Sequence, residues 1–368
     1  SFNLICNSKF NFKINNSNLF DVSKTLGNDS TKFINSVFTS MFNYKMMNQK
    51  KIVIEMLGEG GFSNSNYIHY TNLNAPESLN DWFYDIASST HFKERKILFK
   101  LGVKDVGKDF RSPGAQTKRI NYSQSPGLYQ QFTNNYIGRK VSFSDIINGN
   151  ADATFKISET LMAYNAAYSN TNPYGDATPN RRGMYINLER LDSLKSKSNY
   201  LKCMFLQESV GSGTLKRKSF ILTQIGSNIS LNKFLKLKKQ LKINLGVSNE
   251  VTFRGGEEYE QINLSSNFLD AGISYEFIPK LNLLFGAKIW QAKGNENLII
   301  RDEFNTVVDF EAIEINFREG IVATGFQYNF NQKNTLTLQY QSFNLKNSSI
   351  NEISYGISEF NILYSLNF

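Results

Sequence analysis

The sequence contains two histidines, His69 and His91, which are the first residues to consider for catalysis. A hydrolytic histidine deprotonates a nearby nucleophile, most often a serine. His69 has no GxSxG nucleophile motif to accompany it, and His91 lies beside Phe92 and Lys93 as an interfacial residue would. We expect structural or surface histidines and a protein that is not an enzyme. The alternative is a lipid hydrolase that depends on His69.

Acidic and glycine-rich loops are the next candidates, for metal and phosphate. Glu257, Glu258 and Glu260 offer oxygen ligands of the kind that Ca²⁺ prefers, but their spacing matches no calcium loop. Residues 211–214 precede a basic run, yet they lack the GK[ST] ending of a phosphate-binding loop. The two cysteines lie far apart without a CxxC or histidine companion. We therefore expect no metal and no cofactor.

Basic residues in two groups form the last candidate site: Arg181, Arg182, Lys216, Arg217 and Lys218. They could select anions at a channel mouth, or bind the phosphates of lipid and lipopolysaccharide or the surface of a partner. The formal net charge is +9, but the other basic residues are scattered rather than gathered into a stripe. Nucleic acid is therefore not an expected partner.

Alternation of apolar and polar residues predicts that β-strands carry these side chains. The clearest run is at the end of the chain, where every second residue is apolar: Phe360, Ile362, Tyr364, Leu366 and Phe368. The same pattern recurs at residues 10–14, 34–45, 52–56, 97–103, 138–147, 151–157, 184–188, 201–205, 218–231, 241–247, 260–267, 273–277, 281–289, 313–317, 326–330 and 336–340. No apolar stretch approaches the roughly 18–20 residues that a membrane helix needs. A helical membrane protein is therefore excluded.

A soluble β-sandwich would alternate in the same way, so further features must decide the fold class. Long strands, short turns that alternate with long polar loops, and aromatic residues near strand ends favour a membrane barrel. We predict one domain over residues 1–368, a closed antiparallel transmembrane β-barrel of about fourteen strands (roughly twelve to sixteen) with long outer loops. The chain begins without a signal peptide, as a mature chain or a fragment lacking N-terminal residues would.

Two segments are expected to depart from the strand pattern. Residues 104–137 form a long loop that either lies outside the barrel or folds into its lumen as a plug. Residues 76–87 predict one short amphipathic helix, because Leu79, Trp82, Phe83 and Ile86 follow helical spacing.

The terminal run from Phe360 to Phe368 resembles the C-terminal strand by which the outer-membrane assembly machinery recognises its barrels. Residues 103–115, with the Asn, Lys, Ile and Phe bias of the chain, resemble porin-like barrels of Bacteroidota. The resemblance implies a multi-pass barrel in the outer membrane of a Gram-negative bacterium, in contact with lipid and lipopolysaccharide. It implies two contexts, a free-standing porin-like barrel and an accessory barrel of a larger machine such as the type 9 secretion translocon. No functional residue carries over from it.

The first functional expectation is thus a porin-like barrel that passes small solutes without chemistry. The second is a non-conducting accessory or structural subunit of a larger outer-membrane complex. If the apolar face meets lipid, the polar face lines the lumen, whether the lumen is open or closed by ion pairs. On that assumption these residues face inward: Asp152, Thr154, Lys156, Lys242, Asn244, Glu276, Lys288, Glu314, Asn316, Gln327 and Gln339.

Overall fold

A computed structural model describes residues 2–5, 9–20, 31–69, 77–112, 115–116, 166–191, 197–231, 238–301, 307–331, 333–348 and 353–366. The strands predicted at residues 138–147 and 151–157 lie outside these ranges, as do the inward positions Asp152, Thr154 and Lys156. No helix among the described residues is long and apolar enough to cross a membrane.

The described residues form one antiparallel sheet of fifteen strands, each paired with its neighbours in chain order. Its strands are β1 Phe2–Ile5, β2 Phe10–Phe20, β3 Thr31–Asn48, β4 Ile52–His69, β5 Glu77–Phe92, β6 Ile97–Val106, β7 Arg181–Leu191, β8 Lys197–Gln207, β9 Ser219–Ser230, β10 Leu241–Arg254, β11 Ile262–Ile278, β12 Leu281–Arg301, β13 Val307–Asn329, β14 Asn334–Asn347 and β15 Ile353–Leu366. The all-β, antiparallel prediction is confirmed, and the described strands fall within the predicted range.

The lengths of the connections alternate along the sheet. Successive antiparallel strands reverse direction, so the connections after β2, β4 and each later even-numbered strand share one end. That end carries most of the longer connections, the longest joining β6 to β7 through residues 107–180, whereas residues 231–240 between β9 and β10 are an exception at the other end. The other end has tight turns, such as residues 93–96 between β5 and β6 and residues 279–280 between β11 and β12. This is the predicted asymmetry of short turns and long loops.

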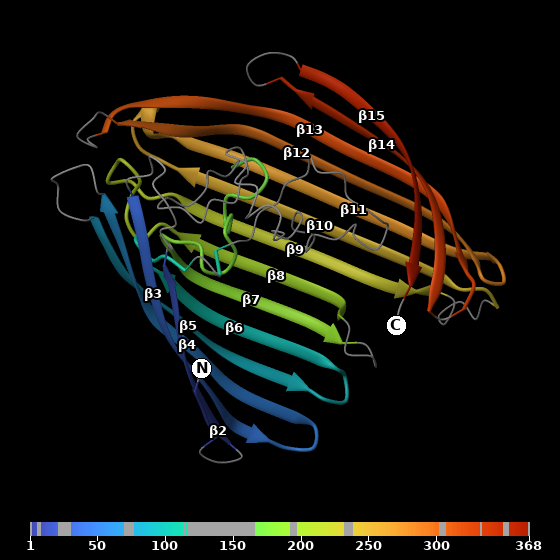
Figure 1. The fold of residues 1–368 in the computed structure, drawn as a ribbon, viewed down its shortest axis with the longest axis horizontal. Coiled ribbons are helices and arrows are strands. Elements are labelled where there is room, and N and C mark those ends of the chain that lie inside the picture. The colour runs from blue at the N-terminus through green and yellow to red at the C-terminus, as the bar shows by residue number, and fades with distance from the viewer. Residues whose placement is uncertain are drawn as a thin grey trace.

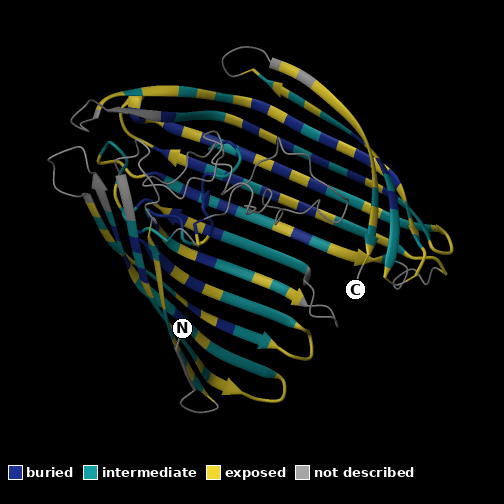
Figure 2. Cartoon of the chain, viewed as in Figure 1, coloured by how far each residue is buried: buried dark blue, intermediate teal, exposed yellow. Residues whose placement is uncertain are grey.

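The two faces of the sheet are chemically opposite. On β10, Leu245 and Val247 are exposed on the outer face, whereas Ser248, Glu250 and Arg254 are buried on the inner face. Buried and exposed positions alternate in the same way along most strands (Figure 2). Large exposed hydrophobic side chains line nearly every strand, while most buried polar ones come from the inner face. The pattern is the reverse of a water-soluble sheet protein, whose apolar face is covered.

The sheet curves strongly, and its two edges do not meet (Figure 1); we call the concave side of the sheet its hollow. β2 and β15 lie apart on opposite sides of that view, and among the described strands β1 and β15 each pair with one neighbour. The described residues therefore do not form a closed ring of strands. The predicted curvature is present, and closure remains a prediction.

The helix predicted for residues 76–87 is wrong, because residues 77–87 belong to β5. It pairs with β4 along nearly its whole length, from Tyr67 with Glu77 to Ile52 with Phe92. The rings of Trp82 and Tyr84 stack with centroids 5.5 Å apart, which residues two positions apart can do on one face of a strand but not of a helix. The spacing of the apolar residues fitted both the helical and the strand period. Pairing with β4 and β6 makes this segment a strand.

The orientation predicted for the first half of β13 is also wrong. Phe317 is buried on the inner face with Ile315 packed in the same cluster, so Glu314 and Asn316 point outward. Apolar residues can face inward here because an inserted part of the chain covers them. Strand alternation and register place the other described positions on the inner face as predicted: Lys242, Asn244, Glu276, Lys288, Gln327 and Gln339.

Candidate functional site

The hollow of the sheet contains part of the β6–β7 connection, residues 166–180, which we call the inserted segment (Figure 1, green). Its first residues pack against β11, β12 and β13. The carbonyl oxygen of Ala167 accepts a hydrogen bond from Trp290 Nε1 at 3.1 Å and another from the Ser266 hydroxyl. The Tyr168 ring lies 5.2 Å from that of Phe317, and its hydroxyl donates to Glu319.

The middle of the inserted segment is held by carboxylates of the wall. The backbone N–H groups of Asn170 and Thr171 both donate to Glu250 Oε2 at 3.0 Å. The Asn170 side chain donates to Glu296 Oε2 at 2.8 Å, and Lys218 forms an ion pair with the other oxygen of Glu296 at 2.6 Å. Carboxylates that accept several donors in a shielded place bind them strongly.

Arg181, the first residue of β7, clamps the same stretch from the opposite direction. Its Nε and a terminal nitrogen donate to the carbonyl oxygens of Thr171 and Asn170 at 3.0 and 2.8 Å. The guanidinium lies 3.8 Å from the centroid of the Phe220 ring, a cation–π contact. Further along, Lys104 on β6 donates to the Asp176 carbonyl at 3.3 Å. The inserted segment thus touches the wall from β6 to β13.

The start of the same connection, residues 107–112 and 115–116, lies against the inner face of β3 to β5. Arg111 donates its backbone N–H to the Ser63 hydroxyl at 2.8 Å, and its carbonyl accepts from Asn35 at 3.1 Å. Gln116 donates to the Ala177 carbonyl at 2.9 Å, which joins this stretch to the inserted segment. The predicted loop begins at residue 107 because Lys104–Val106 belong to β6. Most of its predicted range lies outside the described residues, so the plug formed by residues 104–137 stays a prediction.

The predicted basic residues do not form one site. Arg181 is buried against the inserted segment, while Arg182 points to the outer face and pairs with Asp105 at 2.8 Å. Lys218 is buried in its pair with Glu296, whereas Lys216 and Arg217 are exposed in the β8–β9 loop. Two of the five therefore organise the interior, whereas Arg182, Lys216 and Arg217 are exposed, and binding of lipopolysaccharide or a partner by these residues stays a prediction.

The predicted targeting residues lie on β15. Phe360, Ile362, Tyr364 and Leu366 are all at least half exposed on the outer face, opposite Tyr340, Leu338, Leu336 and Asn334 of β14. Phe368 lies outside the described residues. Recognition of this strand by an assembly machine stays a prediction.

The acidic loop does not have the arrangement of a metal site. Thr214 donates its hydroxyl to the Glu260 carboxylate, and the Glu257 backbone N–H donates at 3.0 Å; together they lower the pKa of Glu260. Protein donors thus occupy its oxygens. No group of three His, Cys, Asp or Glu side chains among the described residues could hold a metal ion.

His91 faces inward in a hollow of about 340 Å³ that Lys45, Glu55, Ser89 and Lys93 also line. It lies at the end of the sheet that carries the short turns. The side chain of His69 lies outside those described. Whether either histidine takes part in catalysis stays a matter of prediction.

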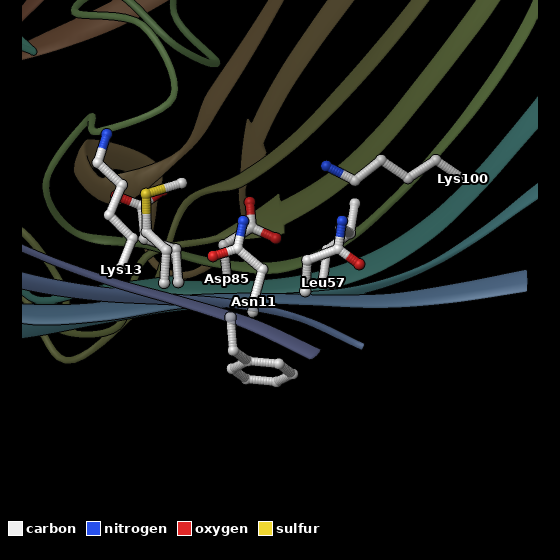
Figure 3. A pocket seen from close by; sticks show the side chains of 10 residues that line it. Asn11, Lys13, Leu57, Asp85 and Lys100 are labelled. Atoms are coloured by element: carbon white, nitrogen blue, oxygen red, sulfur yellow. The ribbon is translucent and has the colours of Figure 1, made fainter. Parts of the chain in front are cut away.

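A second hollow lies on the inner face of β2 to β6, with a volume of about 320 Å³ (Figure 3). Lys13, Glu59, Asp85 and Lys100 line it, so it holds charges of both signs. We call it the charged recess.

The residues that organise the interior were largely missed in the sequence. Glu250 was not among the residues predicted to face inward, because the alternating run was predicted only to residue 247 and β10 continues to Arg254. Glu296 and Glu319 are isolated acidic residues in long strands, and their partners are distant in the chain. The available signal was the strand period itself, which puts Glu250 on the same face as Ser248.

No protein-family model matches the chain, and no curated protein sequence matches it. Among solved structures it is similar to outer-membrane expressed OmpT of Vibrio cholerae, at 9% identity over 98% of this chain and 99% of the other, with a TM-score of 0.32. The transport unit of the autotransporter AIDA-I from Escherichia coli is 8% identical over 99% of this chain and 91% of the other, with a TM-score of 0.22. A mutant porin of Rh. blastica is 12% identical over 96% of this chain and 100% of the other, with a TM-score of 0.22. TM-scores this low assign neither a fold nor a function to this chain.

Proposed function

We propose that this chain is an outer-membrane β-barrel of a Gram-negative bacterium that passes small solutes without chemistry, as a porin does. The reversed sheet carries the proposal, because its exposed side is apolar from β2 to β15 while its charged side is the concave one. So large an exposed apolar surface must be shielded from water, and a lipid bilayer shields the outer face of every strand of a curved sheet at the same time. Strands of ten residues or more, as β6 is, are long enough to cross a bilayer.

The proposal includes closure of the wall along the side where the edges stand apart. An open edge in lipid would leave a row of backbone N–H and C=O groups unpaired, each costing several kcal/mol. We therefore propose that the first and last parts of the sheet are joined in the membrane. The Bacteroidota origin, lipopolysaccharide contact and assembly through the C-terminal strand belong to the same proposal.

Conductance of the folded full chain in a planar lipid bilayer tests the porin function. Stepwise currents that follow insertion of single molecules would support it. Protein that is folded and inserted but carries no current would overturn it.

A non-conducting accessory subunit of a larger outer-membrane complex, such as a type 9 secretion translocon, is the second candidate. The inserted segment favours it, because Glu250, Glu296, Glu319 and Arg181 hold this segment across the hollow by hydrogen bonds. Stable co-purification with a large partner after gentle extraction from native membranes would support this candidate. A homo-oligomer that purifies alone would count against it.

Weakening the hydrogen bonds that hold the inserted segment tests whether this segment restricts the flow of solutes through the barrel. Glu250→Gln removes the charge that accepts two backbone N–H groups, and Glu314→Gln is the matched change on the outer face. If the segment limits flow in a pore, conductance rises in Glu250→Gln and is unchanged in Glu314→Gln. Equal conductance in both variants would show that the segment does not restrict the path.

A further inference from the structure

The charged recess has an ordered arrangement of charges across four strands. The register places Lys13 of β2 beside Met41, Met41 beside Glu59, and Glu59 beside Asp85. Lys100 of β6 lines the recess from its other side, so that Asp85 lies between the two lysines in Figure 3. Along the inner face the recess therefore has a base, a pair of acids and a second base.

The protein leaves these charges incompletely satisfied. Glu59 and Asp85 are like charges directly opposite one another on neighbouring strands, an arrangement that destabilises a sheet. Among the described residues, Lys13, Glu59 and Lys100 make no ion pair, although all three line the same recess. Lys104 of β6 lies opposite Asp85 in the register and offsets part of this cost on one side of the pair. Clusters of perturbed charges of this kind are more typical of functional sites than of the rest of a protein.

Asp85 is held in position by a second residue of the wall. The Tyr185 hydroxyl donates to Asp85 Oδ1 at 2.7 Å. The tyrosine reaches it by lying over Gly102, where a Cβ would come within 2.5 Å of the ring. One carboxylate oxygen is therefore fixed by the protein, and Oδ2, which accepts no hydrogen bond from the part of the chain that the structure describes, is an acceptor for a ligand. Lys100 Nζ lies 5.2 Å from the centroid of the same ring, which keeps the cation beside the acids.

We propose that the charged recess binds small zwitterions that carry both an ammonium and a carboxylate group, namely free amino acids or short peptides. The ammonium would lie between Glu59 and Asp85, and the carboxylate would meet Lys13 or Lys100. Two acids and two bases give the recess no net charge. It would therefore select a ligand by the positions of the ligand's charged groups and not by the ligand's net charge. Met41 and Leu57 supply apolar contact for the carbon skeleton, and about 320 Å³ suits a molecule of this size. The inference rests on the proposed function, because solutes must reach the interior.

Calorimetric titration of the folded full chain in detergent tests the site without any measurement of current. The probes are glycylglycine and glycine, which separate the peptide from the amino-acid source, and N-acetylglycinamide, which resembles the dipeptide but has no charge. We expect glycylglycine or glycine to bind and N-acetylglycinamide not to bind. Equal heats from all three probes would overturn the proposal.

Variants locate the binding. Glu59→Gln should weaken binding of the charged probe by about tenfold or more, as loss of one charged hydrogen bond does. Glu55→Gln is the matched control, four residues away on the same strand and face but outside the recess. The double variant Lys13→Met/Lys100→Met gives an independent reading if Glu59→Gln does not fold, and it should weaken binding similarly because it removes both bases of the recess. Unchanged affinity in a folded Glu59→Gln protein or in the folded double variant would overturn the site.

The outcomes separate this site from the pore. Binding without conductance would overturn the pore and keep the recess. Conductance without zwitterion binding would overturn the recess and keep the pore.

Discussion

Glu250 and Arg181 act on the same two residues of the inserted segment from opposite directions. Glu250 accepts the N–H groups of Asn170 and Thr171, and Arg181 donates to their carbonyl oxygens. Main-chain polar groups inside the hollow would otherwise need water, so these side chains replace the partners that a strand or helix would provide. Arg181 directly follows the inserted segment, whereas Glu250 lies 80 residues from Asn170, so charged residues both near and distant in the sequence set the position of the segment.

The buried pair of Lys218 and Glu296 should be the most sensitive charge contact of the interior. Their side chains are 11% and 13% exposed and 2.6 Å apart. Lys218→Met leaves Glu296 without its cation, and removal of one partner of a buried pair costs about 3–5 kcal/mol. Lys216→Met, two residues earlier and exposed, should change stability by less than about 0.5 kcal/mol. Urea unfolding in lipid vesicles measures both, and equal stability of the two variants would contradict the role given to the pair.

At the scale of the element, each strand has one apolar face on the outside of the sheet and one polar face on the inside. Leu245 on the outer face of β10 and Asn244 on its inner face are neighbours in sequence and differ in what surrounds them. If lipid covers the outer face, Leu245→Arg should destabilise the protein by about 2–4 kcal/mol, because a charge must enter the hydrocarbon. Asn244→Arg is the control and should be tolerated. Unfolding in vesicles with equal losses for both variants would contradict the assignment of the faces.

The edge strand β15 provides a test of closure. In an open sheet only every second amide of Ile353–Leu366 bonds to β14, and the others face outward. If the wall closes in the membrane, amides of both sets should be protected from hydrogen exchange, as those of β14 are. Fast exchange at alternate residues of β15 in lipid would show that the edge stays open.

The sequence was sufficient to predict strands whose apolar residues follow only the strand period. It was insufficient where contacts with other parts of the chain decide the secondary structure or the face that a residue occupies. The alternation of Phe360 to Leu366, and of most other runs, predicted strands that the structure contains. Leu79, Trp82, Phe83 and Ile86 satisfied a helical spacing as well, and only pairing with β4 and β6 excludes it. Ile315 and Phe317 looked lipid-facing because nothing in their own segment reveals that Tyr168 covers them.

The candidate site was harder to predict than the fold, because its parts are distant in the sequence. Arg181 and Lys218 were identified as notable cations, but not as buried groups. Arg181 bonds to residues 170–171 and Lys218 pairs with residue 296, and the alternation of apolar and polar residues along the chain predicts neither contact. The charged recess likewise depends on register, which aligns Lys13, Glu59 and Asp85 across three hairpins.

At the scale of the whole molecule, the sheet places its apolar side outward and its charges inward. The chain has two tryptophans, and they happen to lie on opposite faces. Trp82 on β5 is 52% exposed on the outer face, whereas Trp290 on β12 is 5% exposed and donates to Ala167 in the interior. The native fluorophores can therefore report on both sides of the wall.

Quenching of these tryptophans by lipids brominated along their acyl chains tests most directly that lipid covers the outer face and not the inner one. Trp290→Phe leaves Trp82 as the single fluorophore, and Trp82→Phe leaves Trp290. After insertion into vesicles, we predict strong quenching of Trp82 and little or none of Trp290. Quenching of Trp290 as strong as that of Trp82, or no quenching of Trp82 in inserted protein, would contradict the arrangement of the two faces.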